Sequence, residues 1–152
     1  MAENQGKRVG VVIVSHVDLG AALLGAAEFI LGQQYDCCAV SINTAHDVSD
    51  TVSRLNDAAD RLDFGSGVLI LTDMFGGNPT NIALSLLGKH HVEVVTGVNL
   101  PMLLKVFSQR TLPLDELAEV ARKAGSDGIV VTGKMLSGRK KKDSSRDAPK
   151  ES

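Results

Sequence analysis

Residues 67–81 have the sequence GVLILTDMFGGNPTN, in which an apolar run leads through an acidic residue and two glycines to Asn78 and Pro79. A short, nearly continuous apolar run is typical of a parallel strand that is buried on both faces. Asn is favoured at the cap of a helix and Pro at its first position. This stretch therefore predicts a strand, a glycine loop and a helix.

The rest of the chain repeats the same alternation. Further apolar runs occur at residues 9–14, 37–42, 92–96 and 128–133. Helical spacing of apolar residues predicts helices near residues 19–31, 48–62, 78–88, 100–107 and 114–124, with Asp18 as a cap of the first, Asp47 before the second and Asn99 before the fourth. Strands that alternate with helices predict an α/β fold, a mostly parallel open sheet with helices on both faces.

The composition of the 152 residues is that of one globular domain, with 43% hydrophobic residues and a net charge of −2. The charge is uneven, because residues 137–152 carry +3 and the remainder carries −5. These last sixteen residues have no hydrophobic periodicity. We expect a domain over residues 1–136 and a disordered basic tail over 137–152.

Several classes of protein are disfavoured by the same composition. Cys37 and Cys38 are adjacent in a predicted strand and point to opposite faces, so no disulfide framework is expected. The amino terminus has no apolar signal region and no apolar run is long enough to span a membrane, so we expect a cytoplasmic protein without membrane insertion. The acidic globular part and the absence of Trp argue against nucleic acid as a partner.

Open parallel sheets bind ligands beyond the carboxyl ends of their strands, so the residues that follow each strand are the candidates for a site. They are residues 15–18, 43–46, 73–81 and 97–101. In the third group, Gly76 and Gly77 before a helix start let backbone amides approach an anion such as phosphate. The alternative is that the two glycines only make a tight turn.

His16 and Asp73 meet if the first and third strands are neighbours, as in the strand order 2-1-3-4. A carboxylate on one ring nitrogen fixes the tautomer and leaves the other nitrogen free to act as a nucleophile. The alternative is a capping or core histidine beside a capping aspartate.

Two other kinds of chemistry fit the sequence less well. Ser15 is adjacent to His16 on a strand and so projects the opposite way, and no G-x-S-x-G elbow occurs, which argues against a serine hydrolase. His46, His90 and His91 lack the spacing of metal ligands and are predicted to lie on the surface. No metal or other cofactor is expected.

Three motifs in this order resemble the IIA component of the mannose family of the bacterial sugar phosphotransferase system. They are VVIVSH (11–16), TDMFGGNPTN (72–81) and TGVNLPML (96–103), and the resemblance spans roughly residues 8–134. It implies that the chain is a phosphotransferase component, in which a histidine takes a phosphoryl group from the histidine-containing phosphocarrier protein and passes it to a IIB component. The matching histidine is His16, and the aspartate that orients it matches Asp73.

The resemblance also implies further roles. A phosphoryl group on His16 is expected to contact Gly76, Gly77, Asn78 and Thr80, and the partner proteins are expected to dock on Met74, Phe75, Asn99 and Pro101. Met74 and Phe75 on their own fit either a covered core or a docking surface. The last strand, 128–133, is expected to be antiparallel and exchanged between the two copies of a homodimer.

The sequence departs from the family pattern at two positions. Val17 stands where a glycine usually follows the histidine, which restricts the backbone, and Asn78 stands where Ser or Thr is usual. An amide caps a helix as well as a hydroxyl does and can donate to phosphate.

Three alternatives to sugar transport remain open. A regulatory phosphoprotein of an incomplete phosphotransferase system would carry the same histidine without serving transport. A subunit that serves dihydroxyacetone kinase would phosphorylate that kinase complex and no IIB protein. A nucleotide-binding module would be stabilised by nucleotide, although the chain has no G-x-G-x-x-G motif or P-loop lysine.

Overall fold

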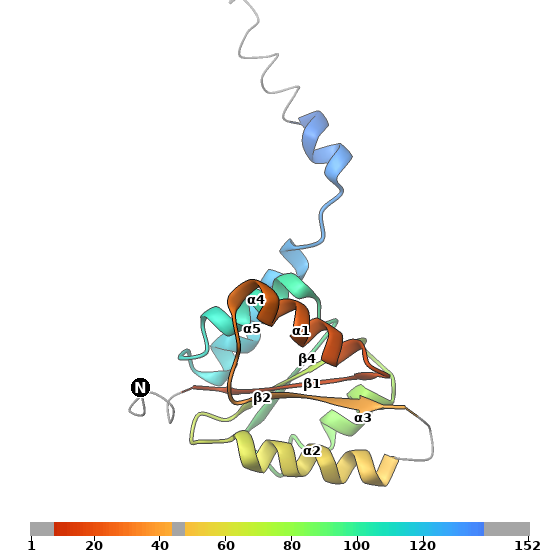
Figure 1. Ribbon diagram of the computed structural model, residues 1–152, viewed down its shortest axis with the longest axis vertical. Coiled ribbons are helices and arrows are strands. Elements are labelled where there is room, and N and C mark those ends of the chain that lie inside the picture. The colour runs from red at the N-terminus through yellow and green to blue at the C-terminus, as the bar shows by residue number, and fades with distance from the viewer. Residues whose placement is uncertain (1–7, 44–47, 139–152) are drawn as a thin grey trace, which may run out of the picture.

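A computed structural model describes residues 8–43 and 48–138 of the chain (Figure 1). Strands and helices alternate along these residues, as predicted. The elements are β1 (Gly10–His16), α1 (Leu19–Leu31), β2 (Cys37–Ile42), α2 (Val48–Leu62), β3 (Val68–Thr72), α3 (Asn78–Leu84), β4 (Val92–Thr96), α4 (Leu100–Ser108) and α5 (Leu114–Asp127). Residues 132–138 are also helical.

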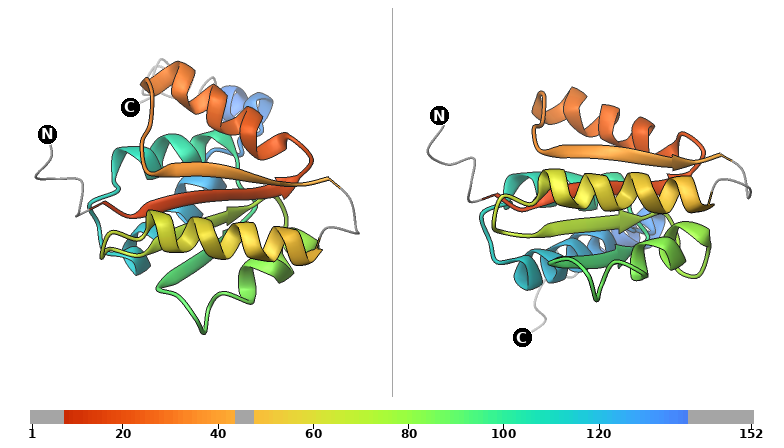
Figure 2. Two further views of the ribbon diagram at one scale, coloured as in Figure 1. Left: turned by 60° about the horizontal axis from the view of Figure 1, so that its bottom comes forward. Right: turned by 90° about the horizontal axis from the view of Figure 1, so that it is seen from below.

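The four strands form one parallel sheet in the order β2-β1-β3-β4. Helices cover both faces: α1, α4 and α5 lie on one side, and α2 and α3 lie on the other (Figures 1 and 2). This arrangement confirms the predicted fold class and the predicted neighbourhood of β1 and β3. The carboxyl ends of all four strands therefore meet at one rim of the sheet.

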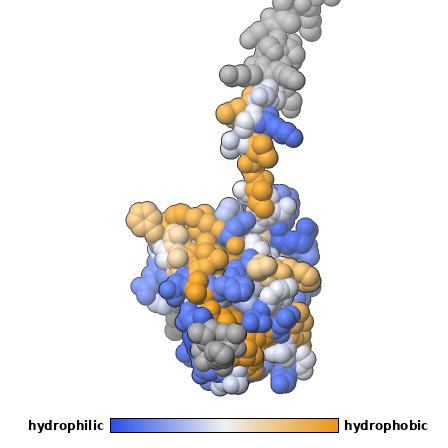
Figure 3. All heavy atoms as spheres, turned by 90° about the vertical axis from the view of Figure 1, so that its right-hand side faces the viewer, coloured by the Kyte–Doolittle hydropathy of each residue, from blue (hydrophilic) through white to orange (hydrophobic). Residues whose placement is uncertain are grey.

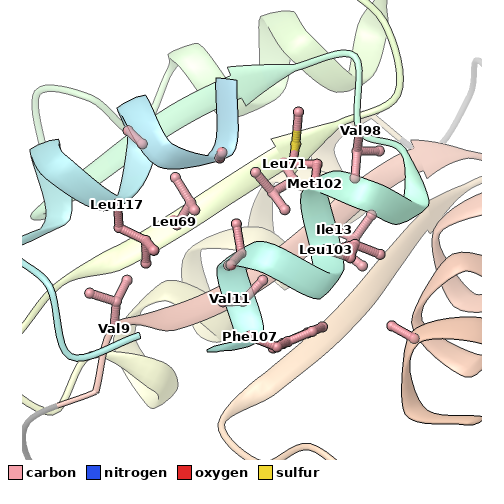
Figure 4. Close-up of a cluster of buried hydrophobic side chains, with 14 of the residues drawn as sticks. Val9, Val11, Ile13, Leu69, Leu71, Val98, Met102, Leu103, Phe107 and Leu117 are labelled. Carbon is pink, nitrogen blue, oxygen red and sulfur yellow. The ribbon is translucent and has the colours of Figure 1, made fainter. Parts of the chain in front are cut away.

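Alternate residues of the inner strands face the two layers of helices, as the pleat of a strand requires. On β1, Val11 and Ile13 pack with Leu103 of α4 in one core, whereas Val12 and Val14 belong to the core beneath α2 and α3. Figure 4 shows the first of these cores, in which side chains of β1 and β3 meet those of α4 and α5. These four β1 side chains are completely buried. Burial on both faces of the sheet explains why the sequence of this inner strand is a nearly continuous apolar run.

The helix ends agree with the sequence in part. Asn99 caps α4 as its position suggested, since its side chain accepts a hydrogen bond from the Met102 amide at 3.0 Å. Asp18 occupies the cap position of α1 but makes no capping bond. Asn78 was expected to cap α3, but Gly77 holds that position and Asn78 is the first helical residue. Asp47 lies outside the described residues.

The predicted last strand, 128–133, does not form in this single chain. Gly128 ends α5, residues 129–131 have no regular structure, and residues 132–138 are helical. Ile129 and Val131 are 77% and 66% exposed. A strand needs a neighbour for its backbone hydrogen bonds, and a β-branched run far from the sheet has none within its own chain.

The predicted tail, residues 137–152, lies almost entirely outside the described residues. Ser137 and Gly138 belong to the helical stretch 132–138, and residues 139–152 lie outside the part of the chain that the structure describes. Within that part, no helix is long and apolar enough to cross a bilayer. Cys37 and Cys38 are both free thiols.

Candidate functional site

The end of β1 and the residue after β3 bring His16 and Asp73 into contact at the carboxyl rim of the sheet. The Asp73 carboxylate atom Oδ2 accepts two hydrogen bonds from His16, one from its backbone amide at 2.9 Å and one from ring Nδ1 at 2.7 Å. The His16 side chain is 49% exposed, whereas that of Asp73 is 8% exposed. The two residues that were predicted to meet therefore do so, with the ring open to solvent above a buried carboxylate.

This contact determines which ring nitrogen is free. A carboxylate accepts hydrogen bonds, so Nδ1 carries the proton and Nε2 of a neutral ring keeps its lone pair. Burial by itself would raise the pKa of Asp73, but the hydrogen bonds from the His16 amide and ring outweigh burial, and the pKa of Asp73 is lowered. Asp73 therefore stays ionised near neutral pH, and it stabilises positive charge on the ring.

The glycine loop after β3 passes beside the imidazole. Gly76 has a φ of 76°, which a residue with a side chain rarely adopts. A β-carbon on Gly77 would lie 3.3 Å from Cε1 and 3.6 Å from Nε2 of His16, so the missing side chain leaves room for the ring. Asn78 follows with an exposed side chain. The loop therefore places the backbone of Gly77 next to the free nitrogen of His16.

Thr80 was predicted to contact a phosphoryl group through the backbone amides of the loop, and its side chain does not reach the surface. It is 1% exposed, and its hydroxyl donates to the Met74 carbonyl at 2.5 Å. The same hydroxyl lies 2.9 Å from that of Thr72, at the end of β3. Thr80 therefore holds the loop from below, and only its backbone is in a position to face an anion. Thr80 lies in the first turn of the short helix α3, and no pattern in the sequence indicated that its hydroxyl faces inward.

The four predicted docking residues fall into two kinds. Met74 and Phe75 are 53% and 79% exposed, which excludes the core alternative within the single chain. Pro101 is also exposed. Asn99 uses its side chain inside the molecule, since Oδ1 caps α4 and Nδ2 donates to the Gly125 carbonyl at 3.0 Å. Asn99 thus ties α4 to α5, whereas Met74 and Phe75 are exposed apolar residues that directly follow Asp73.

Ser15 has a structural role that the sequence did not reveal. It is completely buried, and its hydroxyl accepts a hydrogen bond from the Gly20 amide at 2.7 Å and donates to the Val17 carbonyl at 3.3 Å. Ser15 therefore satisfies the start of α1 in place of Asp18. Its hydroxyl faces the helix and not His16, in agreement with the argument against a serine hydrolase.

His90 and His91 directly precede β4 and so lie at the opposite end of the sheet from the carboxyl rim. His90 was predicted to be a surface residue, but it is mostly buried and bridges to α2, with Nε2 2.9 Å from the Asn56 side-chain oxygen and Nδ1 3.1 Å from Asp60. His91 is exposed, and His46 lies outside the described residues. Across residues 8–43 and 48–138, no three His, Cys, Asp or Glu side chains are grouped so that they could hold a metal ion.

The family model of the PTS system fructose IIA component, EIIA-man, matches residues 10–125. The chain belongs to this family. The matched range contains the whole sheet and every residue of the rim described above. Members of the family are the IIA components of mannose-type and fructose-type phosphotransferase systems, which act as phosphotransferase carriers.

Individual relatives support the same assignment. The mannose-specific EIIAB component of Escherichia coli K12 is 32% identical over 124 residues, which are 80% of this chain and 38% of that protein. The fructose-specific EIIA component of Bacillus subtilis is 31% identical over 103 residues, which cover 67% of this chain and 70% of that protein. The chain thus spans about two fifths of the length of the first relative and most of the second.

Solved structures share the fold. The mannose/sorbose specific IIA subunit from Enterococcus faecalis superposes with a TM-score of 0.75 at 25% identity, covering 82% of this chain and 94% of that one. A phosphotransferase component EIIA from Streptococcus agalactiae gives a TM-score of 0.76 at 24% identity, over 83% and 98% of the two chains. These structures support an open α/β sheet of the same topology.

Proposed function

We propose that this chain is a phosphocarrier of a sugar phosphotransferase system. His16 accepts a phosphoryl group from the histidine-containing phosphocarrier protein and passes it to a IIB component. The observation that carries the proposal is the half-exposed His16 ring, whose Nδ1 is bonded to buried Asp73 and whose Nε2 faces the glycine loop.

In the transfer step, the lone pair of His16 Nε2 attacks the phosphorus atom of the donor's phosphohistidine. A new N–P bond forms as the donor's N–P bond breaks, and the electron pair of the broken bond returns to the donor imidazole. The proton on His16 Nδ1 stays in its hydrogen bond to Asp73, whose charge stabilises the ring as it becomes positive. The second transfer, to the IIB component, is the same step in the opposite direction for His16.

Binding of the phosphoryl oxygens is assigned to the loop beside the ring. We propose that the amides of Gly76, Gly77 and Asn78, together with the exposed Asn78 side chain, donate to these oxygens. Thr80 contributes its amide at most, because its hydroxyl is bonded to Met74. Transfer of this kind depends mainly on positioning and on stabilisation of charge, which the fixed backbone of the loop supplies.

Labelling tests the proposal directly. The chain is incubated with radiolabelled phosphoenolpyruvate, the upstream kinase and the phosphocarrier protein, and the modified residue is mapped. We expect acid-labile label on His16, transfer of that label to a IIB protein, and no label on a His16→Gln variant. A His91→Gln variant is the matched control, because His91 is exposed and remote from the loop, and it should be labelled like the wild type. A His16→Gln protein that is labelled normally contradicts the assignment.

We also propose that the protein is a homodimer in which residues 128–133 add to the sheet of a second copy. β4 is an edge strand, and a groove of about 550 Å³ runs along it, lined by Glu93, Val94, Val95, Thr96, Asp115, Ala118, Glu119 and Arg122. In Figure 3 the segment toward the C-terminus is apolar where it leaves the body, and apolar and hydrophilic residues are mixed further along. An open edge and an exposed β-branched segment fit addition of a strand.

The dimer is tested by molar mass in solution. Light scattering after size-exclusion chromatography should give twice the mass of the chain for the wild type and a monomer for a protein with Ile129→Asp and Val131→Asp. A wild-type monomer at all concentrations refutes strand exchange.

The compartment of the protein, expected from its sequence to be the cytoplasm, stays a prediction.

A further inference from the structure

The turn between β1 and α1 contains a strained residue directly after the proposed phosphoryl acceptor. Val17 has a φ of 44°, and among the described residues only Val17 and Asp36 have positive φ without being glycine. Aspartate is enriched in the left-handed region, whereas a β-branched residue there is a steric outlier. A glycine would adopt this conformation without strain.

Hydrogen bonds on both sides impose the conformation. The Val17 amide donates to the Ile42 carbonyl at 2.9 Å, and the Val17 carbonyl accepts from the Ser15 hydroxyl. These bonds tie the turn to the end of β2 and to the buried strand β1. The backbone therefore needs the left-handed geometry at position 17, but nothing in the turn needs a valine side chain.

Burial does not account for the side chain either. Val17 is 57% exposed. It lies on the chain directly after His16, while Met74 and Phe75 lie directly after Asp73, so exposed apolar residues follow both members of the pair. The valine side chain adds strain where a glycine would add none, and neither burial nor the hydrogen bonds of the turn account for it, which is an indication of a functional role.

We propose that Val17 is a specificity-determining residue whose side chain contacts the phosphoryl donor protein as that protein docks over His16. This inference rests on the proposed function. The donor it fits presents its phosphohistidine beside apolar side chains, with basic residues around them. Residues 1–136 of this chain carry −5, and Asp18 is exposed next to Val17, which gives the charge complement of such a surface.

The test compares a large donor with a small one. Rates of phosphorylation of His16 are measured with the phosphorylated phosphocarrier protein and with phosphoramidate, a small molecule that makes no contact with a docking rim. For Val17→Gly we expect a higher midpoint of urea unfolding, a fivefold or larger loss of kcat/KM with the protein donor, seen mainly in KM, and a phosphoramidate rate within twofold of the wild type.

A matched pair of variants separates docking from loss of exposed apolar surface in general. Val17→Ala keeps a β-carbon and should lose part of the rate with the protein donor. Ile30→Ala removes a side chain that is 54% exposed near the far end of α1, and it should transfer like the wild type.

Two results overturn the inference while leaving the proposed function intact. One is a Val17→Gly protein that is more stable and reacts with the protein donor at the wild-type kcat/KM. The other is an equal loss with both donors, which would mean that Val17 acts only by positioning His16. A wild-type protein that neither donor phosphorylates overturns the proposed function itself.

Discussion

Two residues with left-handed backbone geometry flank α1: Val17 lies in the turn before the helix, and Asp36 lies in the turn between the helix and β2. The two turns are stabilised in different ways. Asp36, before β2, has a φ of 55°, and its carboxylate pairs with Arg8 at 2.9 Å while its carbonyl accepts from Arg110 at 2.7 Å. Val17, before α1, has only backbone and hydroxyl partners and an exposed side chain. The turn at Asp36 serves the fold, whereas the turn at Val17 carries strain next to His16, the proposed phosphoryl acceptor.

Arg110 links the segments that lead into β1 and β2 at the amino ends of the strands, which we call the amino rim. It is 3% exposed, and its guanidinium donates to the carbonyls of Val9, Tyr35 and Asp36. Burial lowers the pKa of Arg110, and burial also raises the pKa of the neighbouring Cys37 to about 11, although the Arg110 charge opposes the second effect. The Cys37 thiol is therefore protonated near neutrality, and this rim holds chain segments together without a reactive group.

The largest loss of stability is expected when the three hydrogen bonds of Arg110, which we call the Arg110 clamp, are removed. Arg110→Met removes a donor from three carbonyls of the amino rim, and of these the Asp36 carbonyl keeps a hydrogen bond from the Val11 amide at 3.1 Å. Each buried carbonyl left without a donor costs about 1–3 kcal/mol, and loss of a buried charged partner adds to this, so we expect a loss of about 3–5 kcal/mol in the free energy of unfolding. Urea unfolding measures it. Arg122→Met, which removes an exposed pair with Glu119, should cost less than about 1 kcal/mol.

If the amino and carboxyl rims have separate roles, the Arg110 clamp should affect stability and not phosphorylation of His16. At a temperature where Arg110→Met is still folded, its rate of phosphorylation by phosphoramidate should equal that of the wild type. A loss of phosphorylation without a loss of stability would show that the two rims are coupled.

An intermediate effect is expected at the carboxyl rim from Asp73→Asn. The amide retains the acceptor for His16 but removes the charge, which weakens these hydrogen bonds by about 1 kcal/mol. Because the pKa of Asp73 is lowered in the folded state, its contribution is present above the pKa of an unfolded aspartate, about 3.9, and is lost as the pH falls through the folded value. The wild type should therefore be the more stable protein at pH 7, and the difference should shrink below about pH 4.

Urea midpoints of the two proteins between pH 7 and pH 3 measure this difference. Phosphorylation of His16 should also be slower in Asp73→Asn at pH 7. A gap in stability that is the same at every pH would show that the Asp73 charge has no part in it.

The smallest change in stability is expected from glycine substitutions in the two turns, at Asp36 and at Val17. Asp36→Gly relieves little strain and removes the ion pair with Arg8, so we expect a loss of less than about 1 kcal/mol, opposite in sign to the gain expected for Val17→Gly. Thermal unfolding of both variants in the same buffer provides the comparison. A gain of equal size in both would mean that the turns do not differ.

Much of the fold followed from local pattern. Continuous apolar runs marked the strands of a sheet buried on both faces, and placing β1 beside β3 was enough to predict the contact of His16 with Asp73. These predictions succeeded because burial on both faces leaves few alternatives for such a run, and because parallel strands end at a common rim.

The misses have physical causes. Residues 129–131 have the composition of a strand, but whether a strand forms depends on a neighbour that the chain itself does not provide. Ser15, and not Asp18, satisfies the start of α1, because the left-handed turn at Val17 brings the Ser15 hydroxyl to the Gly20 amide and the pattern of residue types does not reveal that turn. The positive φ of Val17 was hidden, since valine is among the residues least expected to adopt it.

The single carboxylate oxygen that binds both the amide and the ring of His16 has a consequence for the cycle of the carrier. Because backbone and imidazole are held at one point, we expect the ring to keep its orientation when it takes up the phosphoryl group that we propose for it. Little reorganisation would then accompany the proposed exchange, and the transfer would run readily in either direction.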